Sequence, residues 1–382
     1  MQKLIPQLRF PEFKGEWEEK KLGDIGKFVG GGTPSTSNDD YWNGDIPWIS
    51  SSDIFENEIH NIRTSRFLTE DAIRESATKI IPKNSILLVS RVGVGKLAVN
   101  KVEVCTSQDF NNFIVANDNS NFIGYDLISR KNILQNFSQG TSIKGFTSND
   151  IKTLSITIPT LPEQTKIATF LTTVDEKLTA LKQKKSLLEQ YKKGVMQQIF
   201  SQKLRFKDDN GIDFPDWEEK KLGEVAKKKS SNISANKIEE NTGNYIIYGA
   251  SGILKKVDFY KEEDDYVSIV KDGAGVGRLL YCKGKSSVLG TMEIISPNSE
   301  LNTYFLYCLL SNIDFVKYVT GSTIPHIYFK DYSVEHCGIP SLPEQTKIAN
   351  FLSAIDEKIN YCQGQIEKTA VWKKGLLQQM FV

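Results

Sequence analysis

Two glycine-rich turns come closest to a sequence that could do chemistry. "RVGVGKL" covers residues 91–97 and "KDGAGVGRL" covers residues 271–279, each between β-like segments. A nucleotide-binding loop needs GxxxxGK[ST], or GxGxxG leading into a helix, and neither spacing is present. We therefore predict strand–loop–strand connections in which glycine permits positive φ. Lys96 and Arg278 follow the turns at matching places and could reach a phosphate or a guanine edge, although an ordinary exposed charge is equally compatible.

A second candidate is the polar stretch "GGGTPSTSNDDYWNGDIPWISSSDI" at residues 30–54. Its hydroxyls and amides suit hydrogen bonds to base edges and phosphates, and its aromatic residues offer rigid contact area. The alternative is an ordered Ω-like loop pinned by buried tryptophans. The loops "SQGTSIKGF" (138–146) and "VTGSTIPHI" (319–327) have similar chemistry at equivalent positions, which favours a shared role.

No catalytic or metal-binding pattern stands out. The five cysteines are scattered without a CxxC pair, and there are only three histidines. "PDWEEK" (215–220) resembles a nuclease motif, but the two halves of that motif normally come from separate strands. We therefore expect a recognition scaffold with no catalytic residue, no metal site and no cofactor of its own.

Length and composition suggest two or three domains in the 382 residues. No apolar run is long enough to span a membrane, and the N-terminus lacks a signal-peptide pattern, so a cytoplasmic protein is expected. The net charge is +1, but residues 161–207 carry ten basic and four acidic side chains. This excess is a solvated helix face or a phosphate-facing surface.

An internal repeat organises the whole chain. "LPEQTKIATFLTTVDEKL" (161–178) and "LPEQTKIANFLSAIDEKI" (342–359) share 13 of 18 residues at an offset of 181. "WEEKKLGDI" (17–25) returns as "WEEKKLGEV" (217–225) at an offset of 200. The N-terminus also reads as the continuation missing after the C-terminus. We infer pseudo-twofold symmetry, with the two chain ends close together.

Each repeated segment predicts a long helix. Thr160 and Ser341 begin capping-box patterns with Glu163 and Glu344. Apolar residues then recur at heptad spacing in eight of ten slots, and Lys192 and Lys373 interrupt the same slot. A helix of about 38 residues would be about 57 Å long, and so narrow a seam requires a partner helix. We predict an antiparallel pair; two unrelated amphipathic helices are the alternative.

Polar positions of the two helices match as well, which a seam alone does not require. Taking these positions as solvent-facing, we predict two identical surfaces for two copies of one partner, with recent duplication as the competing explanation. The predicted partner-binding residues are Glu163, Gln164, Lys166, Asp175, Glu176, Lys193, Glu344, Gln345, Lys347, Asp356, Glu357 and Lys374.

The predicted fold class is α+β, with two globular α/β domains separated by two long antiparallel helices that form a coiled coil. The expected layout is a first recognition domain (1–160), a first spacer helix (161–207), a second domain (208–341) and a second spacer helix (342–382). The strand candidates are residues 85–90, 97–104, 112–116, 266–270 and 293–296.

This organisation resembles the specificity subunit of type I restriction-modification systems. The resemblance rests on "GGGTPSTSNDDYWNGDIPWIS", on "QGTSIKGFTSNDIKTLSITIP" with "LPEQTKIATFL", and on the second-copy counterpart "GSTIPHIYFKDY" with "IPSLPEQTKIANFL". It spans essentially the whole chain. Its most specific part is the P-x-EQ-x-x-I-A helix start that closes each domain.

The resemblance implies that each variable region reads half of a bipartite, asymmetric target in double-stranded DNA and that the helices fix the spacer. Two methyltransferase subunits would bind the helices and supply S-adenosylmethionine and adenine chemistry. Restriction subunits would bring ATP- and Mg²⁺-dependent translocation and cleavage. The alternatives are a free-standing DNA-binding protein without methyltransferase partners, and an enzyme with cryptic activity.

The residues predicted to contact DNA lie in the loops at 30–50, 91–96, 140–146, 248–252, 271–278 and 321–328. They are Thr33, Ser35, Ser37, Tyr41, Trp42, Arg91, Lys96, Ser142, Lys144, Tyr248, Ser251, Lys271, Arg278, Ser322, Thr323 and His326. For Tyr41, Trp42 and Tyr248, a place in the core is the alternative.

Overall fold

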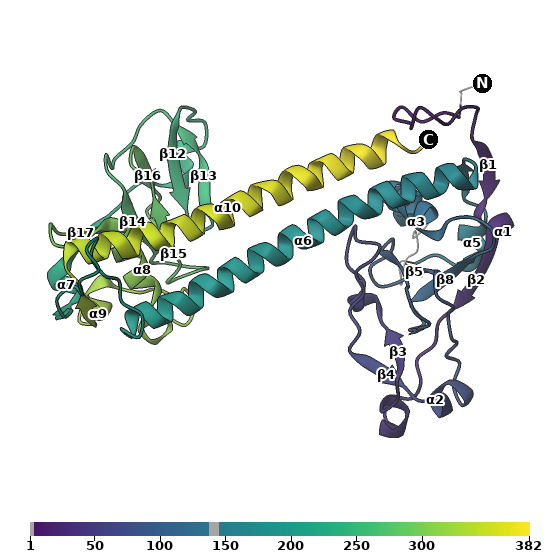
Figure 1. Cartoon of the computed structure of the whole chain (residues 1–382), viewed down its shortest axis with the longest axis horizontal. Helices are drawn as coiled ribbons and strands as arrows, with labels where there is room; N and C mark the ends of the chain where they lie inside the picture. The colour runs from purple at the N-terminus through teal and green to yellow at the C-terminus, as the bar shows by residue number, and fades with distance from the viewer. Residues whose placement is uncertain (1–3, 137–144) are drawn as a thin grey trace. The chain divides into compact units, whose positions relative to one another are not determined.

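The computed structural model describes residues 4–136 and 145–382. They form two compact units, one made of Met1–Lys182 with Gly364–Val382 and the other of Gln183–Gln363. Two long helices, α6 (Leu161–Phe200) and α10 (Leu342–Gln379), each contribute to both units (Figure 1). Each unit therefore consists of a globular part, the first half of one long helix and the second half of the other.

The first unit is built on three small sheets. An antiparallel sheet has the order β2 (Gly26–Gly30), β8 (Phe110–Val115), β5 (Ile86–Val89), β6 (Leu97–Val99). A second sheet has the order β4 (Arg66–Leu68), β3 (Ile46–Ile49), β7 (Cys105–Thr106), with β3 and β7 parallel. β1 (Glu18–Lys21) pairs with β9 (Ser155–Ile158). The helices are α1 (Leu22–Ile25), α2 (Glu70–Arg74), α3 (Ser120–Ser129), α4 (Lys131–Asn136) and α5 (Ser148–Lys152).

The second unit repeats this topology. Its antiparallel sheet has the order β11 (Ala226–Ser230), β17 (Met292–Pro297), β14 (Tyr266–Val270), β15 (Leu279–Cys282). Its mixed sheet has the order β13 (Gly252–Val257), β12 (Tyr245–Gly249), β16 (Ser286–Val288), with β12 and β16 parallel. β10 (Glu218–Lys221) pairs with β18 (His336–Ile339), and the helices are α7 (Leu222–Val225), α8 (Thr303–Ser311) and α9 (Phe329–Tyr332). The fold is therefore an α+β pseudo-twofold repeat, as predicted.

The repeated WEEKKLG segments close each globular part. Glu18 lies opposite Ile158 in the β1–β9 pair, and Glu218 lies opposite Ile339 in the β10–β18 pair. The leucine that follows each strand, Leu22 or Leu222, is fully buried. The segment therefore joins the start of each domain to the strand that leads into its long helix.

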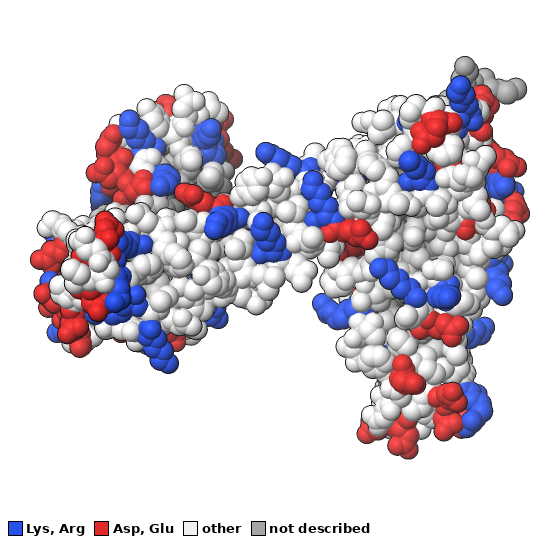
Figure 2. Space-filling view, viewed as in Figure 1, with Lys and Arg blue, Asp and Glu red and all other residues white. Residues whose placement is uncertain are grey.

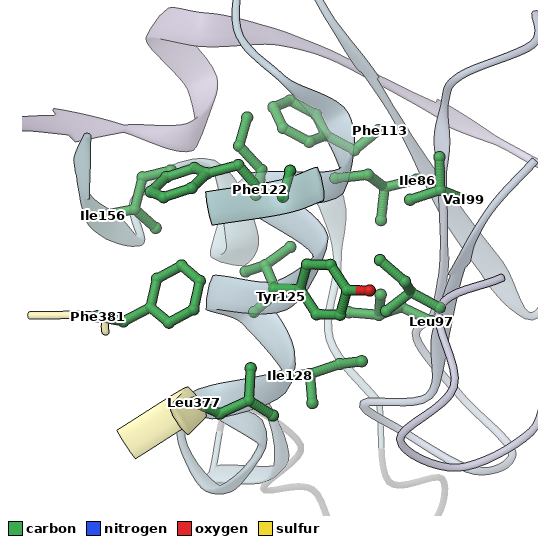
Figure 3. Close-up of a cluster of buried hydrophobic side chains, with 14 of the residues drawn as sticks. Ile86, Leu97, Val99, Phe113, Phe122, Tyr125, Ile128, Ile156, Leu377 and Phe381 are labelled. Carbon is green, nitrogen blue, oxygen red and sulfur yellow. The ribbon is translucent and has the colours of Figure 1, made fainter. Parts of the chain in front are cut away.

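The core of the first unit collects residues that are distant in the sequence (Figure 3). Phe122, Tyr125 and Ile128 of α3 pack between the sheet strands and the C-terminal end of the chain. That end contributes Leu377 of α10 and Phe381, which follows the helix. Phe122 and Phe381 have ring centroids 5.2 Å apart. The first globular part is thus incomplete without the last turn of the second long helix.

The heptad residues near both ends of each long helix are buried, as the antiparallel prediction requires. In the first unit, residues near the start of α6 share a core with residues near the end of α10, and in the second unit the roles are exchanged. The residues concerned are Ile167, Leu171, Val174, Leu376 and Met380 in the first unit, and Val195, Ile199, Ile348, Leu352 and Ile355 in the second.

The ends of the long helices differ from the sequence prediction. The capping boxes were wrong: Ser341 Oγ has no hydrogen-bond partner among the described residues, and Glu163 and Glu344 bind arginines instead. α6 ends at Phe200 rather than at residue 207, and the chain then turns through Gln202 at a φ of 57°.

The N-terminal segment contacts the C-terminal helix, as the circular repeat predicted. The backbone N–H of Leu8 donates to the carbonyl of Gln379 at 2.8 Å, and Arg130 donates to the carbonyl of Val382 at 2.7 Å. No helix in the described part of the chain is long and apolar enough to cross a membrane.

Candidate nucleic-acid interface

Three loops of the second unit, which the sequence separates, are joined by hydrogen bonds. The Arg278 guanidinium donates to the carbonyl of Ala250 at 2.9 Å, which links the loops at 271–278 and 248–252. Gly273 N–H donates to the carbonyl of Pro325 at 2.8 Å, which links the first of these loops to the loop at 319–328. The structure therefore brings all three predicted recognition loops of this domain into one connected group.

The 319–328 loop has a fixed shape although it is exposed. Thr320 and His326 exchange two backbone hydrogen bonds of 2.9 and 2.8 Å. Gly321 has a φ of +89°, and a Cβ there would lie 2.4 Å from the carbonyl oxygen of Ile324. Ser322 and Thr323 are exposed at this turn. A rigid turn presents hydroxyls without a large ordering cost on binding.

The glycine-rich turns have the predicted geometry. They connect β5 to β6 and β14 to β15, and their glycines have φ between +83° and +90°. The backbone N–H of Lys96 donates to Gly93 at 3.2 Å, and that of Arg278 donates to Gly275 at 2.9 Å. The two basic residues therefore occupy equivalent places in the two domains.

The loops of the first unit also converge. Phe146 N–H donates to the carbonyl of Ser90 at 3.1 Å, and Ser90 N–H donates to the carbonyl of Asp109 at 2.8 Å. Thr33 Oγ1 donates to the side chain of Gln108 in the same β7–β8 connection. The predicted loops at 30–50, 91–96 and 140–146 thus meet around one strand connection, as far as the structure describes them.

The aromatic side chains of the polar stretch at residues 30–54 hold this loop in place. Trp48 is buried and its indole N–H donates to the carbonyl of Gly32 at 3.0 Å. Trp42 packs edge-on against Trp48 at 5.1 Å and donates to the carbonyl of Ser35 at 3.1 Å. Tyr41 donates to Glu75 at 2.8 Å, a hydrogen bond that raises the pKa of the tyrosine. The loop thus has the pinned character of the alternative interpretation, while Ser35, Thr36 and Ser37 stay exposed.

The remaining predicted contacts have mixed surroundings. Exposed side chains are Ser35, Ser37, Arg91, Ser251, Arg278, Ser322 and Thr323, and half-buried ones are Thr33, Lys96, Lys271 and His326. Ser142 and Lys144 lie outside the described residues. Tyr248 is 8% exposed in a core cluster, which agrees with the alternative of a place in the core.

Charge is not concentrated on either globular part in the face shown in Figure 2, where basic and acidic side chains are interspersed. Several exposed lysines are paired. Lys228 and Lys229 of β11, for example, bind Glu293 at 3.2 Å and Glu262 at 2.6 Å. Among the described residues, no group of three His, Cys, Asp or Glu side chains could hold a metal ion.

The expectation that the repeated polar helix positions face solvent was wrong for four of the predicted partner-binding residues. Glu163, Gln164, Glu344 and Gln345 are at most 1% exposed. Arg9 binds Glu163 at 2.7 Å, and Arg205 binds Glu344 at 2.9 Å. The two glutamates repeat because each one anchors, through an arginine, the segment that precedes the WEEKKLG strand of its own domain.

The two glutamines act on the globular parts in the same way. Gln164 accepts from the backbone N–H of Asn119 at 2.9 Å and donates to the carbonyl of Pro159. Gln345 accepts from the N–H of Asn302 at 2.8 Å and donates to the carbonyl of Pro340. Both tie the first turn of a long helix to the N-cap of a domain helix, α3 or α8.

Asp175 and Asp356 were also predicted to face solvent, but both are half-buried. Lys373 binds Asp175 at 2.5 Å and Lys192 binds Asp356 at 2.6 Å. A lysine in an apolar seam together with a repeated aspartate is the sequence signal for this pairing.

Four predicted partner-binding residues are exposed without a hydrogen bond or ion pair to any described residue. They are Glu176 and Lys193 on α6 and Glu357 and Lys374 on α10. Lys166 and Lys347 are engaged with the entering segments, through Glu12 at 3.5 Å and Asp209 at 2.6 Å. We call the first four the free repeat positions.

Comparison with known proteins defines the class of this protein. The model of the type I restriction modification DNA specificity domain matches residues 14–190 and again residues 215–369. The chain belongs to this family. Proteins of the family recognise DNA targets for restriction-modification complexes, in which catalysis lies in other subunits.

Individual relatives agree with this assignment. The MjaIX specificity subunit of a type I restriction enzyme from Methanocaldococcus jannaschii is 29% identical and covers 96% of this chain and 92% of its own. The EcoR124I/EcoR124II specificity subunit from Escherichia coli is 34% identical over 44% of this chain and 43% of its own. The crystal structure of an S subunit from M. genitalium has the same fold, with a TM-score of 0.71, 18% identity and 99% coverage of both chains.

Proposed function

We propose that this chain reads a bipartite, asymmetric DNA target, with one half-site contacted by each globular domain. The observation that carries the proposal is the combination of shared topology and different loops. Both domains have the same strand order and an equivalent glycine-rich turn, but the segments that connect β2 to β3 and β11 to β12 differ in length and in sequence. Two domains that share a fold but differ in their loops are suited to bind two different half-sites.

The contacts divide into two kinds. Arg91, Lys96, Lys271 and Arg278 supply positive charge for phosphates or guanine edges, and the loop hydroxyls supply shorter-range hydrogen bonds. Because the net charge is only +1, much of the phosphate contact that dominates affinity would come from partner subunits.

Exchanging one domain tests the two-reader proposal. Residues 217–341 are replaced by the equivalent region of a homologue with a known different target, and genomic adenine methylation is mapped in a strain that carries the partner subunits. One half of the methylated motif should change while the other half and the gap remain. A change in both halves would refute independent readers.

We further propose that two methyltransferase subunits bind the long helices at the free repeat positions. Glu176 and Glu357 are equivalent, as are Lys193 and Lys374, so one partner surface can be used twice. Beside each lysine lie an exposed aromatic residue, Tyr191 or Trp372, and a glycine, Gly194 or Gly375, whose absent Cβ leaves open space. A glycine in a helix interior destabilises the helix by about 1 kcal/mol relative to alanine. Close approach of a partner to the helix backbone would explain why glycine occupies these two positions.

Charge reversal tests this surface. The variant with Glu176→Lys, Lys193→Glu, Glu357→Lys and Lys374→Glu should lose copurification with methyltransferase subunits, since both docking surfaces are altered. The matched control reverses Lys184 and Lys368, which are exposed on the same helices at positions that do not repeat. Full stoichiometric copurification of the first variant would refute docking at the free repeat positions. An unchanged protein that copurifies with no methyltransferase subunit would favour the alternative, a free-standing DNA-binding protein.

A further inference from the structure

A polar cluster interrupts the apolar seam in the first unit. Asp175 of α6 accepts a hydrogen bond from the hydroxyl of Tyr125 of α3 at 2.8 Å and is 2.5 Å from Nζ of Lys373 of α10. The lysine also donates to the carbonyl of Asn57 at 2.8 Å. The Lys373 and Asp175 side chains are only 7% and 12% exposed. One buried cluster therefore joins the globular part to both long helices.

The second unit contains the same cluster with the helices exchanged. Lys192 of α6 donates to both carboxylate oxygens of Asp356 of α10, at 2.6 and 2.7 Å. The hydroxyl of Tyr304 of α8 donates to the same carboxylate. We call Tyr125, Asp175 and Lys373 the first polar cluster, and Tyr304, Asp356 and Lys192 the second.

Apolar seams alone do not define the register of two helices. Sliding one helix by seven residues, about 10 Å, again sets apolar slots against apolar slots. A charged side chain in the seam removes that freedom, because the slide would leave a lysine and an aspartate buried without partners, which is strongly destabilising. Single polar residues in a seam are known to specify register in this way.

We propose that the two polar clusters fix the register of α6 against α10, and thereby determine which gap between the two half-sites the protein accepts. The inference rests on the proposed function, in which each globular part reads one half-site. The six side chains are positioning residues: they contact no base, and they act by holding each domain to one turn of the opposite helix.

The test replaces both ion pairs by apolar residues in the complex with the methyltransferase subunits. The variant carries Asp175→Leu, Lys373→Met, Asp356→Leu and Lys192→Met. Replacing a buried ion pair by apolar side chains is often neutral or stabilising, so the thermal transition should be equal to or above that of the unchanged protein. Lys184→Met with Lys368→Met is the control, because both lysines are exposed on the same helices.

The readout is the methylation rate on duplexes with the natural gap and with gaps changed by one to three base pairs. The preference for the natural gap should fall at least tenfold in the cluster variant and stay within twofold in the control. Lys192→Arg with Lys373→Arg, which keeps both charges, should retain the preference. If the cluster variant does not fold, Tyr125→Phe with Tyr304→Phe decides, with an expected loss of at least threefold.

An unchanged gap preference in the folded cluster variant would overturn the inference. Register would then reside in the aromatic contacts at the helix ends, Phe122 with Phe381 and Phe200 with Phe305. Failure of the proposed function would look different, because the unchanged protein itself would then show no two-part target.

Discussion

Removing the buried carboxylate of Glu344 should destabilise the second unit more than any other substitution of a repeated helix residue. Glu344 is fully buried and binds Arg205 through two hydrogen bonds of 3.2 and 2.9 Å. The indole N–H of Trp217 donates to the same carboxylate at 3.1 Å. Glu344→Ala therefore leaves a guanidinium and an indole without their acceptor.

The expected magnitude follows from these contacts. Breaking a buried ion pair by removing one partner costs about 3–5 kcal/mol. Arg205 is 24% exposed and keeps the carbonyls of Phe214 and Pro215, so the low end of that range applies to it. Loss of the indole hydrogen bond adds about 1 kcal/mol. We expect a total of about 4 kcal/mol.

Glu163 provides an internal comparison. It binds Arg9, but the indole N–H of Trp17 has no hydrogen-bond partner among the described residues. Glu163→Ala should therefore cost about 1 kcal/mol less. Glu357→Ala, at an exposed position of α10, should cost less than about 0.5 kcal/mol.

The assay is hydrogen–deuterium exchange of the β14 and β17 amides for the second unit and of the β5 and β8 amides for the first. It reports the opening free energy of each unit separately, which a single melting curve does not. Losses for Glu344→Ala and Glu357→Ala that agree within error would refute the anchoring role.

Three further predictions follow from single side chains. Burial would raise the pKa of Asp53, but hydrogen bonds from Ser50 and Arg66 outweigh burial and hold the pKa below its ordinary value. The stability that this carboxylate contributes is present above about pH 4 and is lost as the pH falls through the folded pKa. Asp53→Asn should therefore flatten the acid limb of a stability–pH profile, and an unchanged limb would contradict this. Arg278→Ala should weaken DNA binding and reduce the salt slope by about one, measured by anisotropy; an unchanged slope would mean no phosphate contact. Gly321→Ala should impair recognition of the second half-site only, because its Cβ would collide with the carbonyl of Ile324; normal methylation of the full target would exclude a role for this turn.

The helical part of the architecture could be predicted because its sequence is periodic. Heptad spacing and the constant offset predicted two antiparallel helices, and the predicted strand at 266–270 coincides with β14. The strand order within each globular part was not predicted. Strand order depends on contacts between distant residues, and in sequences this diverged no local pattern records which strands pair.

The loops of the candidate nucleic-acid interface could be predicted from the sequence, but the contacts of the repeated polar helix residues were not predicted. Glycine turns and hydroxyl-rich segments identified the loops that the structure brings together. The repeated polar residues were misassigned because identity between two copies does not distinguish an external partner from an internal one. Arg9 and Arg205, which bind Glu163 and Glu344, were the missing signal: each lies in a short "LRF" that also repeats.

We infer that this chain selects a two-part DNA target for methylation by other subunits. Methylome sequencing of the host with and without the gene is the decisive measurement. We expect one asymmetric motif, made of two short halves with a fixed gap, whose adenine methylation disappears when the gene is deleted and returns on complementation. An unchanged methylome, or a lost motif that is continuous or palindromic, would contradict it.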